Sequence, residues 1–154
     1  LVAAQDLAWS VFEGVAFCRV ELDLYAARAS GRALSAERIL EAFTEHFGAL
    51  FRGVCGFGER DALVAMAGWA NYAAGYRFYN FQYAVGALTA LALMSRRRGD
   101  EAAFASSLLR FLAYGASASP AEQLGVFGVE LGSSALWEEG LAELEARFAG
   151  VAAI

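Results

Sequence analysis

Apolar side chains recur every three or four residues along most of this chain, which is the spacing of an amphipathic helix. The first such run covers about residues 3–30 and ends at Gly31, a residue that readily adopts the left-handed conformation of a helix end. Its apolar stripe consists of Leu7, Val11, Val15, Cys18, Leu22 and Tyr25. The charged residues Glu13, Glu21, Asp23 and Arg28 fall mostly off this stripe. We therefore expect a long first helix that buries the stripe and exposes these charges.

Helix-capping residues divide the remainder of the chain. Ser35 is a favourable N-cap for a second helix to about residue 52, which would bury Ile39, Phe43, Phe47, Leu50 and Phe51. A glycine-rich loop at residues 54–58 precedes a helix over about residues 59–72, in which Leu63, Met66, Ala67, Trp69 and Ala70 would face inward.

Three further helices are predicted after a tyrosine-rich helix over residues 76–98. One covers residues 101–114, with Phe104, Leu108, Phe111 and Leu112 on its apolar face. The next begins at a capping box formed by Ser119 and Glu122. The last begins near Ser134 and carries Trp137, Leu141, Leu144, Phe148 and Val151, with Glu138, Glu139, Glu143 and Glu145 largely off this stripe. No window alternates with period two, so we predict an all-α bundle of six or seven helices that forms one domain over residues 1–154.

The tyrosine-rich segment allows two interpretations. If the helix begins near Tyr76, then Tyr76, Tyr79 and Tyr83 lie on one face, which Gly86, Ala87, Ala90 and Met94 continue. The three tyrosines then form either an aromatic stripe in the core or a row of hydroxyl groups that faces a substrate, because a buried tyrosine hydroxyl needs a hydrogen-bond partner.

Composition and charge argue against two classes of partner. The net charge is −5, all 12 basic residues are arginine, and no basic stripe follows a predicted helix, so we expect no nucleic-acid partner. Hydrophobic residues make up 58% of the chain. The apolar run 84–94 is nevertheless shorter than the ~20 residues that cross a bilayer, so we expect a buried helix and no membrane partner. The cluster Arg96, Arg97 and Arg98 follows this run, where cations complement the dipole of a helix end.

The potential metal ligands are sparse. Cys18 and Cys55 have no metal-type spacing, and we interpret them as small buried residues in a reducing compartment, which predicts a cytoplasmic protein. The one histidine, His46, stands beside Glu45, and zinc would need further ligands that this spacing does not offer. We expect a partly exposed surface histidine.

Several motifs, in order, resemble one family. Residues 78–86 (FYNFQYAVG) resemble the tyrosine-rich helix near the C-terminus of the oligoendopeptidase F branch of the thimet-type zinc metallopeptidases. Residues 9–28, 34–37 (LSAE) and 46–48 (HFG) are similar to segments that precede this helix in the family. Residues 119–122 (SPAE), 127–131 (FGVEL) and 136–141 (LWEEGL) are similar to segments that follow it.

This resemblance covers almost the whole chain but only the C-terminal part of the family's catalytic domain. It implies a helical fold around a channel in which one zinc ion hydrolyses short peptides, with an HExxH motif that this chain lacks. It also implies that Tyr79, Tyr76 and Tyr83 donate hydrogen bonds to the substrate carbonyl as it becomes an oxyanion. Arg77, Asn80, Tyr72 and Asn71 are the corresponding candidates for substrate contact.

Two departures from the family pattern leave a second hypothesis open. The family usually has a histidine shortly before the tyrosine helix, whereas residues 69–73 contain none, and Asn71 offers only a neutral donor there. Phe81 replaces a frequent tyrosine. The chain, which begins at Leu1, is therefore either a fragment of a zinc oligopeptidase, whose partner is the missing zinc-binding part, or a non-catalytic helical module that binds peptides or pairs with another subunit.

Overall fold

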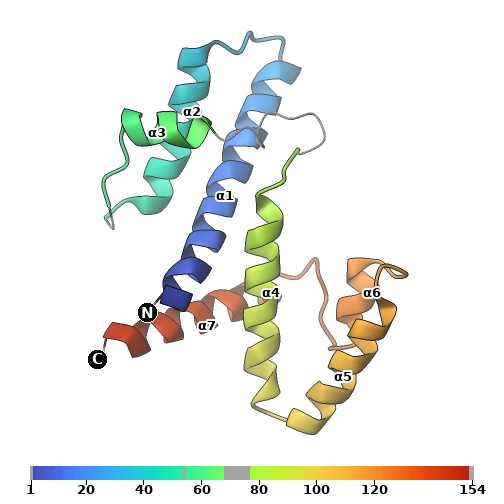
Figure 1. Cartoon of the computed structure of the whole chain (residues 1–154). Coiled ribbons are helices and arrows are strands. Elements are labelled where there is room, and N and C mark those ends of the chain that lie inside the picture. The colour runs from blue at the N-terminus through green and yellow to red at the C-terminus, as the bar shows by residue number, and fades with distance from the viewer. Residues whose placement is uncertain (1, 54, 68–76, 153–154) are drawn as a thin grey trace. The chain divides into compact units, whose positions relative to one another are not determined.

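The fold is all-α, as the periodicity predicts. The computed structural model describes residues 2–53, 55–67 and 77–152, and within these ranges it contains seven helices and no strand (Figure 1). The helices are α1 (Val2–Ala29), α2 (Ala36–Phe51), α3 (Glu59–Met66), α4 (Phe81–Arg97), α5 (Glu101–Tyr114), α6 (Pro120–Gly125) and α7 (Ser134–Ala152). They are distributed over two compact units, one formed by residues 6–85 and the other by residues 1–5 and 86–154.

Local capping groups define several helix ends where the sequence places them. The Ser35 hydroxyl accepts a hydrogen bond of 3.2 Å from the Arg38 backbone N–H at the start of α2. At the start of α6, the Ser119 hydroxyl accepts from the Glu122 N–H while the Glu122 carboxylate accepts from the Ser119 N–H, so the predicted capping box is confirmed. Such caps depend on residues within one turn, which is why the sequence alone locates them.

An aromatic core joins α1 to α2 in the unit of residues 6–85. The Phe17 ring of α1 makes edge-to-face contacts with Phe43 and Phe47 of α2, at centroid distances of 5.8 and 5.1 Å. Phe57 stacks on Phe47 from the loop before α3, and α3 packs on α2. Each buried phenylalanine contributes about 1.5–3 kcal/mol of transfer free energy, so these rings fix the two helices against each other.

The buried face of α1 differs from the predicted stripe. Leu22 and Tyr25 are exposed, whereas Val20 and Glu21 are buried, and Ala16 and Phe17 are buried one turn earlier. The prediction that Glu21 faces solvent is therefore wrong. It failed because α1 is apolar around most of its circumference, so three- and four-residue spacings fit more than one face, and packing against α2 selects between them. In α3, Leu63 is likewise exposed and Ala62 is buried.

Polar contacts also join α1 to α2. The Asp23 carboxylate accepts a hydrogen bond of 2.5 Å from the Arg38 guanidinium, and His46 Nε2 lies 3.4 Å from the same carboxylate oxygen. Burial would raise the pKa of Asp23, but these two partners outweigh it and hold that pKa below its ordinary value. His46 is half-buried beside an acid. Cys18 is half-buried and Cys55 is exposed, so the prediction that both cysteines are buried is wrong for Cys55.

In the second unit, α4 and α7 meet at their backbones. A Cβ atom added at Gly140 would lie 2.5 Å from the Leu88 carbonyl oxygen and 3.1 Å from the Leu88 Cα. Leu136 and Leu144 of α7 are buried, and so is Glu143, although the stripe prediction exposes it. Its ion pairs with Arg98 and Arg147 offset the cost of burying the Glu143 carboxylate.

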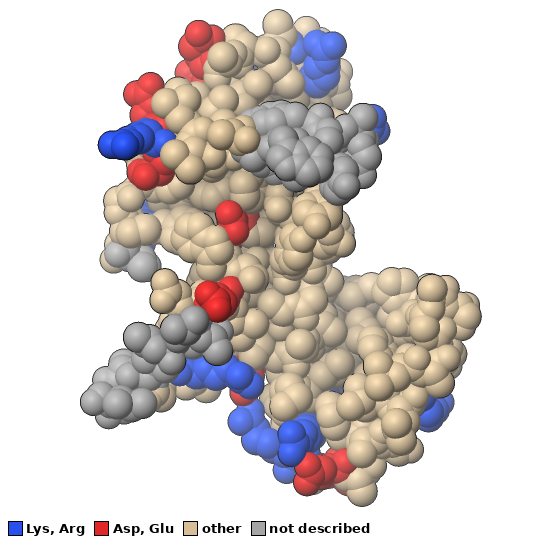
Figure 2. Space-filling view, viewed as in Figure 1, with Lys and Arg blue, Asp and Glu red and all other residues tan. Residues whose placement is uncertain are grey.

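Each arginine at the end of α4 has an acidic partner. Arg96 donates two hydrogen bonds of 2.9 Å to the Glu139 carboxylate and a third, of 3.2 Å, to the Phe127 carbonyl oxygen. Arg97 pairs with Glu101, and Arg98 pairs with Glu143. Figure 2 shows these charges gathered where α4 ends and α5 begins, beside a mostly uncharged face. None of the helices within the described ranges has both the length and the hydropathy that crossing a membrane requires.

Candidate functional site

The tyrosine-rich segment is a turn followed by a helix. The prediction that a helix begins near Tyr76 is wrong, because residues 77–80 form a turn and α4 begins at Phe81. Phe78 has a φ of 54°, in the left-handed region, and an α-helix cannot continue through that conformation. Arg77, Tyr79 and Asn80 lie in the turn, and Tyr83 lies in the first turn of α4. Asn71, Tyr72 and Tyr76 lie outside the described residues.

The hydroxyl groups of Tyr79 and Tyr83 nevertheless meet. The Tyr83 hydroxyl donates a hydrogen bond of 2.6 Å to the Tyr79 oxygen, and the two rings pack edge to face at 5.4 Å. Donation to Tyr79 raises the pKa of Tyr83, because ionising Tyr83 would break this bond. Tyr83 is consequently a neutral donor at physiological pH.

The core interpretation of this stripe is wrong for Tyr83, whereas Tyr79 and Ala87 are half-buried. Tyr83 is 48% exposed, and Gly86, Ala90 and Met94 on the same stripe are also exposed. The buried face of α4 consists instead of Ala84, Leu88, Leu91 and Ala92. The role of the tyrosines as hydrogen-bond donors to a substrate stays a prediction.

Helix α1 holds the turn in place through a hydrogen bond and a ring stack. Glu21 Oε2 accepts a hydrogen bond of 2.6 Å from the Phe78 backbone N–H. One helical turn further along α1, the Tyr25 ring stacks on the Phe78 ring at a centroid distance of 5.4 Å. A left-handed conformation at a residue other than glycine costs of order 1–3 kcal/mol, and these two contacts offset that cost.

Gly14 allows α1 to approach the same turn closely. A Cβ atom at this position would lie 2.8 Å from the Asn80 carbonyl oxygen and 3.1 Å from the Ala84 Cβ. Real Cβ atoms do not tolerate the first of these distances, so a side chain here would push the turn away from α1. Gly14, Glu21 and Tyr25 together make α1 the support on which Tyr79 and Tyr83 are positioned.

Glu21 is the functional candidate that sequence reasoning missed. It is only 7% exposed, and its second oxygen, Oε1, is buried without a hydrogen-bond partner among the described residues. Burial raises the pKa of Glu21 above its ordinary value of 4.5, although the hydrogen bond from Phe78 acts in the opposite direction. The signal in the sequence is its position four residues after Phe17 and directly after Val20, on the face that packs against α2.

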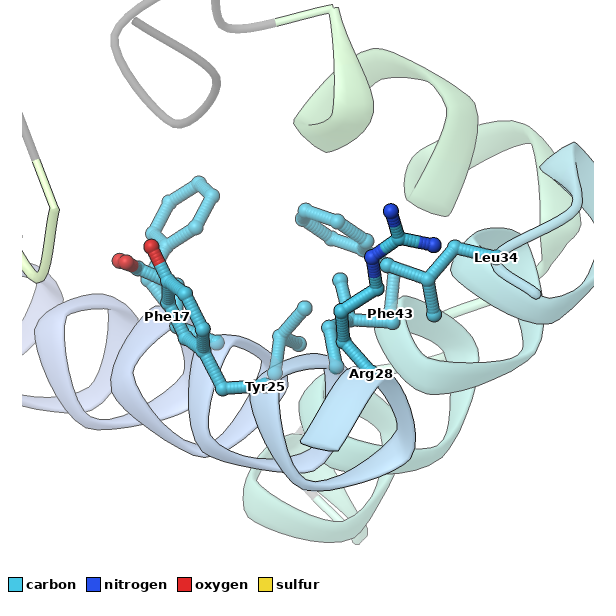
Figure 3. A pocket seen from close by; sticks show the side chains of 8 residues that line it. Phe17, Tyr25, Arg28, Leu34 and Phe43 are labelled. Carbon is cyan, nitrogen blue, oxygen red and sulfur yellow. The ribbon is translucent and has the colours of Figure 1, made fainter. Parts of the chain in front are cut away.

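A cavity of about 230 Å³ has Glu21 among the residues of its wall. Tyr25 and Arg28 supply the other polar groups of the wall, and its apolar part consists of Phe17, Val20, Leu24, Leu34 and Phe43. Figure 3 shows Tyr25 and Arg28 on opposite sides of the cavity, with the rings of Phe17 and Phe43 behind them.

The donor groups of the described residues do not fit a zinc ion. The part of the chain that the structure describes contains no cluster of three histidine, cysteine, aspartate or glutamate side chains that could hold a metal. His46 is the single histidine of the sequence, and its Nε2 faces Asp23.

Comparison with known protein families, curated proteins and solved structures gives no match. The resemblance to the oligoendopeptidase F branch therefore rests on the sequence motifs alone.

The groups at this site differ in what they can do chemically. Because Tyr83 uses its only hydroxyl hydrogen on Tyr79, Tyr79 is the phenol of this pair that can donate to an oxygen that gains negative charge, and a rigid donor needs little reorganisation when that charge develops. The Glu21 carboxylate acts within the fold, since one oxygen accepts from the Phe78 N–H and the other is buried.

Proposed function

We propose that this chain is the substrate-binding C-terminal portion of a zinc metallo-oligopeptidase that hydrolyses short peptides. One observation supports the proposal most directly. The segment that resembles the family's tyrosine helix presents Tyr79 and Tyr83 in direct hydroxyl contact, with Tyr83 half exposed. Tyrosines that only filled space in the core would not need hydroxyl groups that meet at a half-exposed position.

In this proposal the phenols stabilise the oxyanion of the tetrahedral intermediate. Tyr83 donates its only hydroxyl hydrogen to Tyr79, so Tyr79 is the direct donor to the oxyanion and Tyr83 acts through Tyr79. The Phe78 turn, held by Glu21, sets the position of Tyr79 at the start of α4. Removing one such donor from an acyl-transfer enzyme costs about 10²–10³ in kcat. Arg77 and Asn80 belong to the same turn and are proposed to contact the peptide backbone, together with Tyr76, Asn71 and Tyr72.

The zinc ligands are assigned to a part of the enzyme outside this chain, because the donor set here does not fit the metal. The roles proposed for Tyr79 and Tyr83 do not involve the zinc ion. The proposed partners are short peptides and the zinc-binding part, and the proposed location is the cytoplasm.

The test compares two tyrosine variants of the complete enzyme. Tyr79→Phe should lower kcat by roughly 10²-fold or more on a fluorogenic peptide, with an unchanged melting temperature. Tyr114→Phe, at the end of α5, is the matched control and should leave kcat unchanged. Equal activity of Tyr79→Phe and the parent enzyme would rule out the oxyanion role, whereas a large fall in melting temperature would assign Tyr79 a structural role.

A non-catalytic module that pairs with another subunit is the second candidate. Helix α5 has no buried residue among those described, and it exposes Leu108, Leu109 and Leu112. Exposed apolar residues that cluster on one helix are typical of protein contacts. Intact mass and metal content of the native material discriminate the two candidates. A mass well above 16.4 kDa with about one zinc per chain supports the peptidase, and 16.4 kDa without zinc supports the module.

A further inference from the structure

The cavity between α1 and α2 has a mostly apolar wall. Phe17, Val20 and Phe43 form its buried part, and the half-buried Leu24 and Leu34 complete the apolar surface. An apolar cavity of about 150 Å³ is large enough to hold benzene, so the volume of about 230 Å³ here admits an apolar group of about six carbon atoms. Transfer of such a group from water into the cavity is favourable, because it removes apolar surface from water.

The one carboxylate in the wall is not available to a ligand. Glu21 Oε2 accepts the hydrogen bond from the Phe78 backbone N–H, and Glu21 Oε1 is buried. A ligand would have to displace the turn at Phe78 or open the core to reach these oxygens. The Glu21 carboxylate therefore supports the turn, and a ligand must be recognised by another polar group of the wall.

Arg28 is the polar group that fits this role. It is exposed, it belongs to the cavity wall, and it forms no ion pair with any residue that the structure describes. Figure 3 shows Arg28 on the side of the cavity opposite Tyr25. Its position in the last turn of α1 complements the helix dipole, and that role does not occupy the N–H donors of its guanidinium group. A guanidinium group binds a carboxylate through two parallel, charge-assisted hydrogen bonds.

We propose that this cavity binds an apolar monocarboxylate of the size of a short-chain fatty acid, with its carboxylate on Arg28 and its hydrocarbon tail against Leu24 and Leu34. The charge of Arg28 selects the acid over an amine, which it repels, and over an alcohol, which forms a weaker hydrogen bond. This binding site is separate from the hydroxyls of Tyr79 and Tyr83, and it does not depend on peptide hydrolysis.

NMR titration of the ¹⁵N-labelled 154-residue chain with four probes tests the proposal. Hexanoate should cause saturable shifts of the backbone amides of Leu24, Arg28 and Leu34. Hexanol and hexylammonium have the same tail and should bind at least about tenfold more weakly, because neither forms a charge-assisted pair with Arg28. Acetate has the same head group without the long tail, and it should also bind at least about tenfold more weakly, because it buries little apolar surface.

Two arginine variants of α1 form a matched pair. Arg28→Gln removes the charge and leaves the apolar wall, so it should lower the affinity for hexanoate at least about tenfold, towards that of hexanol. Arg19→Gln removes another exposed arginine of the same helix, one that lines a different pocket with Asp23 and His46, and should retain the affinity of the parent chain.

Three outcomes would overturn the proposal. The first is that hexanoate causes no saturable shift at Leu24, Arg28 and Leu34. The second is that hexanol, hexylammonium or acetate binds as tightly as hexanoate, and the third is that Arg28→Gln retains the parent affinity. The first two outcomes require only the parent chain, so they do not depend on whether a variant folds.

Discussion

Replacing Gly14 by alanine tests the contact between α1 and the tyrosine turn. Two effects oppose each other at this position. Alanine is favoured over glycine by about 1 kcal/mol in a helix interior. However, its Cβ would lie 2.8 Å from the Asn80 carbonyl oxygen and 3.3 Å from the Ala84 backbone nitrogen. Both neighbours are backbone atoms that cannot rotate away, so the turn or the helix must move.

Gly48→Ala isolates the cost of this clash. Gly48 lies in α2, and a Cβ atom there would meet nothing within 4 Å, so the substitution retains only the gain in helix propensity. Overpacking costs about 1–3 kcal/mol. We therefore expect Gly48→Ala to stabilise the chain by up to about 1 kcal/mol, and Gly14→Ala to be about 1–3 kcal/mol less stable than Gly48→Ala. The propensity term cancels in that difference, and both glycines belong to the unit of residues 6–85.

Two measurements check the expectation. Urea unfolding followed by circular dichroism gives the free energies of the two variants. Amide exchange measured by NMR should show faster exchange at Phe78 in Gly14→Ala, because displacing the turn loosens its hydrogen bond to Glu21. If Gly14→Ala were as stable as Gly48→Ala, with unchanged protection at Phe78, the close approach of α1 to the turn would be refuted.

The other two predictions concern a second close approach and the buried acid. Gly140→Ala should destabilise the chain by about 1–3 kcal/mol relative to Gly86→Ala, because only the former places a Cβ against the Leu88 backbone; equal free energies of urea unfolding would contradict this. The raised pKa of Glu21 means that the folded state binds the proton more tightly, so stability falls as pH rises from the unfolded value of 4.5 through the folded pKa. Glu21→Gln removes this dependence. The free energy of urea unfolding of the variant minus that of the parent should therefore be larger at about pH 7 than at about pH 4. A difference that does not change with pH would contradict the raised pKa.

The features that depend on neighbours in the sequence were predicted well. The bounds of α5, the Ser35 cap and the capping box at Ser119 all match, because each depends on residues within one helical turn. The aromatic face of α2 was also predicted, since Phe43 and Phe47 recur at helical spacing among charged residues that cannot be buried cheaply. In these elements the local pattern allows only one arrangement.

The features that depend on distant contacts were not predicted. The start of α4 is set by the left-handed Phe78, whose conformation depends on Glu21 and Tyr25, two residues of α1. The burial of Glu21 depends in turn on which apolar face of α1 meets α2. A helical period fits either face, and no nearby residue shows that a carboxylate is needed to bind the Phe78 amide. The candidate tyrosines were identifiable from the sequence, but the support that positions them was not.

The hydrogen bond from Phe78 to Glu21 has a consequence for synthesis on the ribosome. Its two partners are 57 residues apart, so α1 is made well before the turn that it holds. At about 5–20 residues added per second, roughly 3–11 s pass between the synthesis of Glu21 and that of Phe78, and more time passes before Phe78 leaves the ribosome. Helices α1 and α2 can pair during that interval through local aromatic contacts. The tyrosine turn is therefore expected to be among the later parts of this unit to reach its final geometry in a newly made chain.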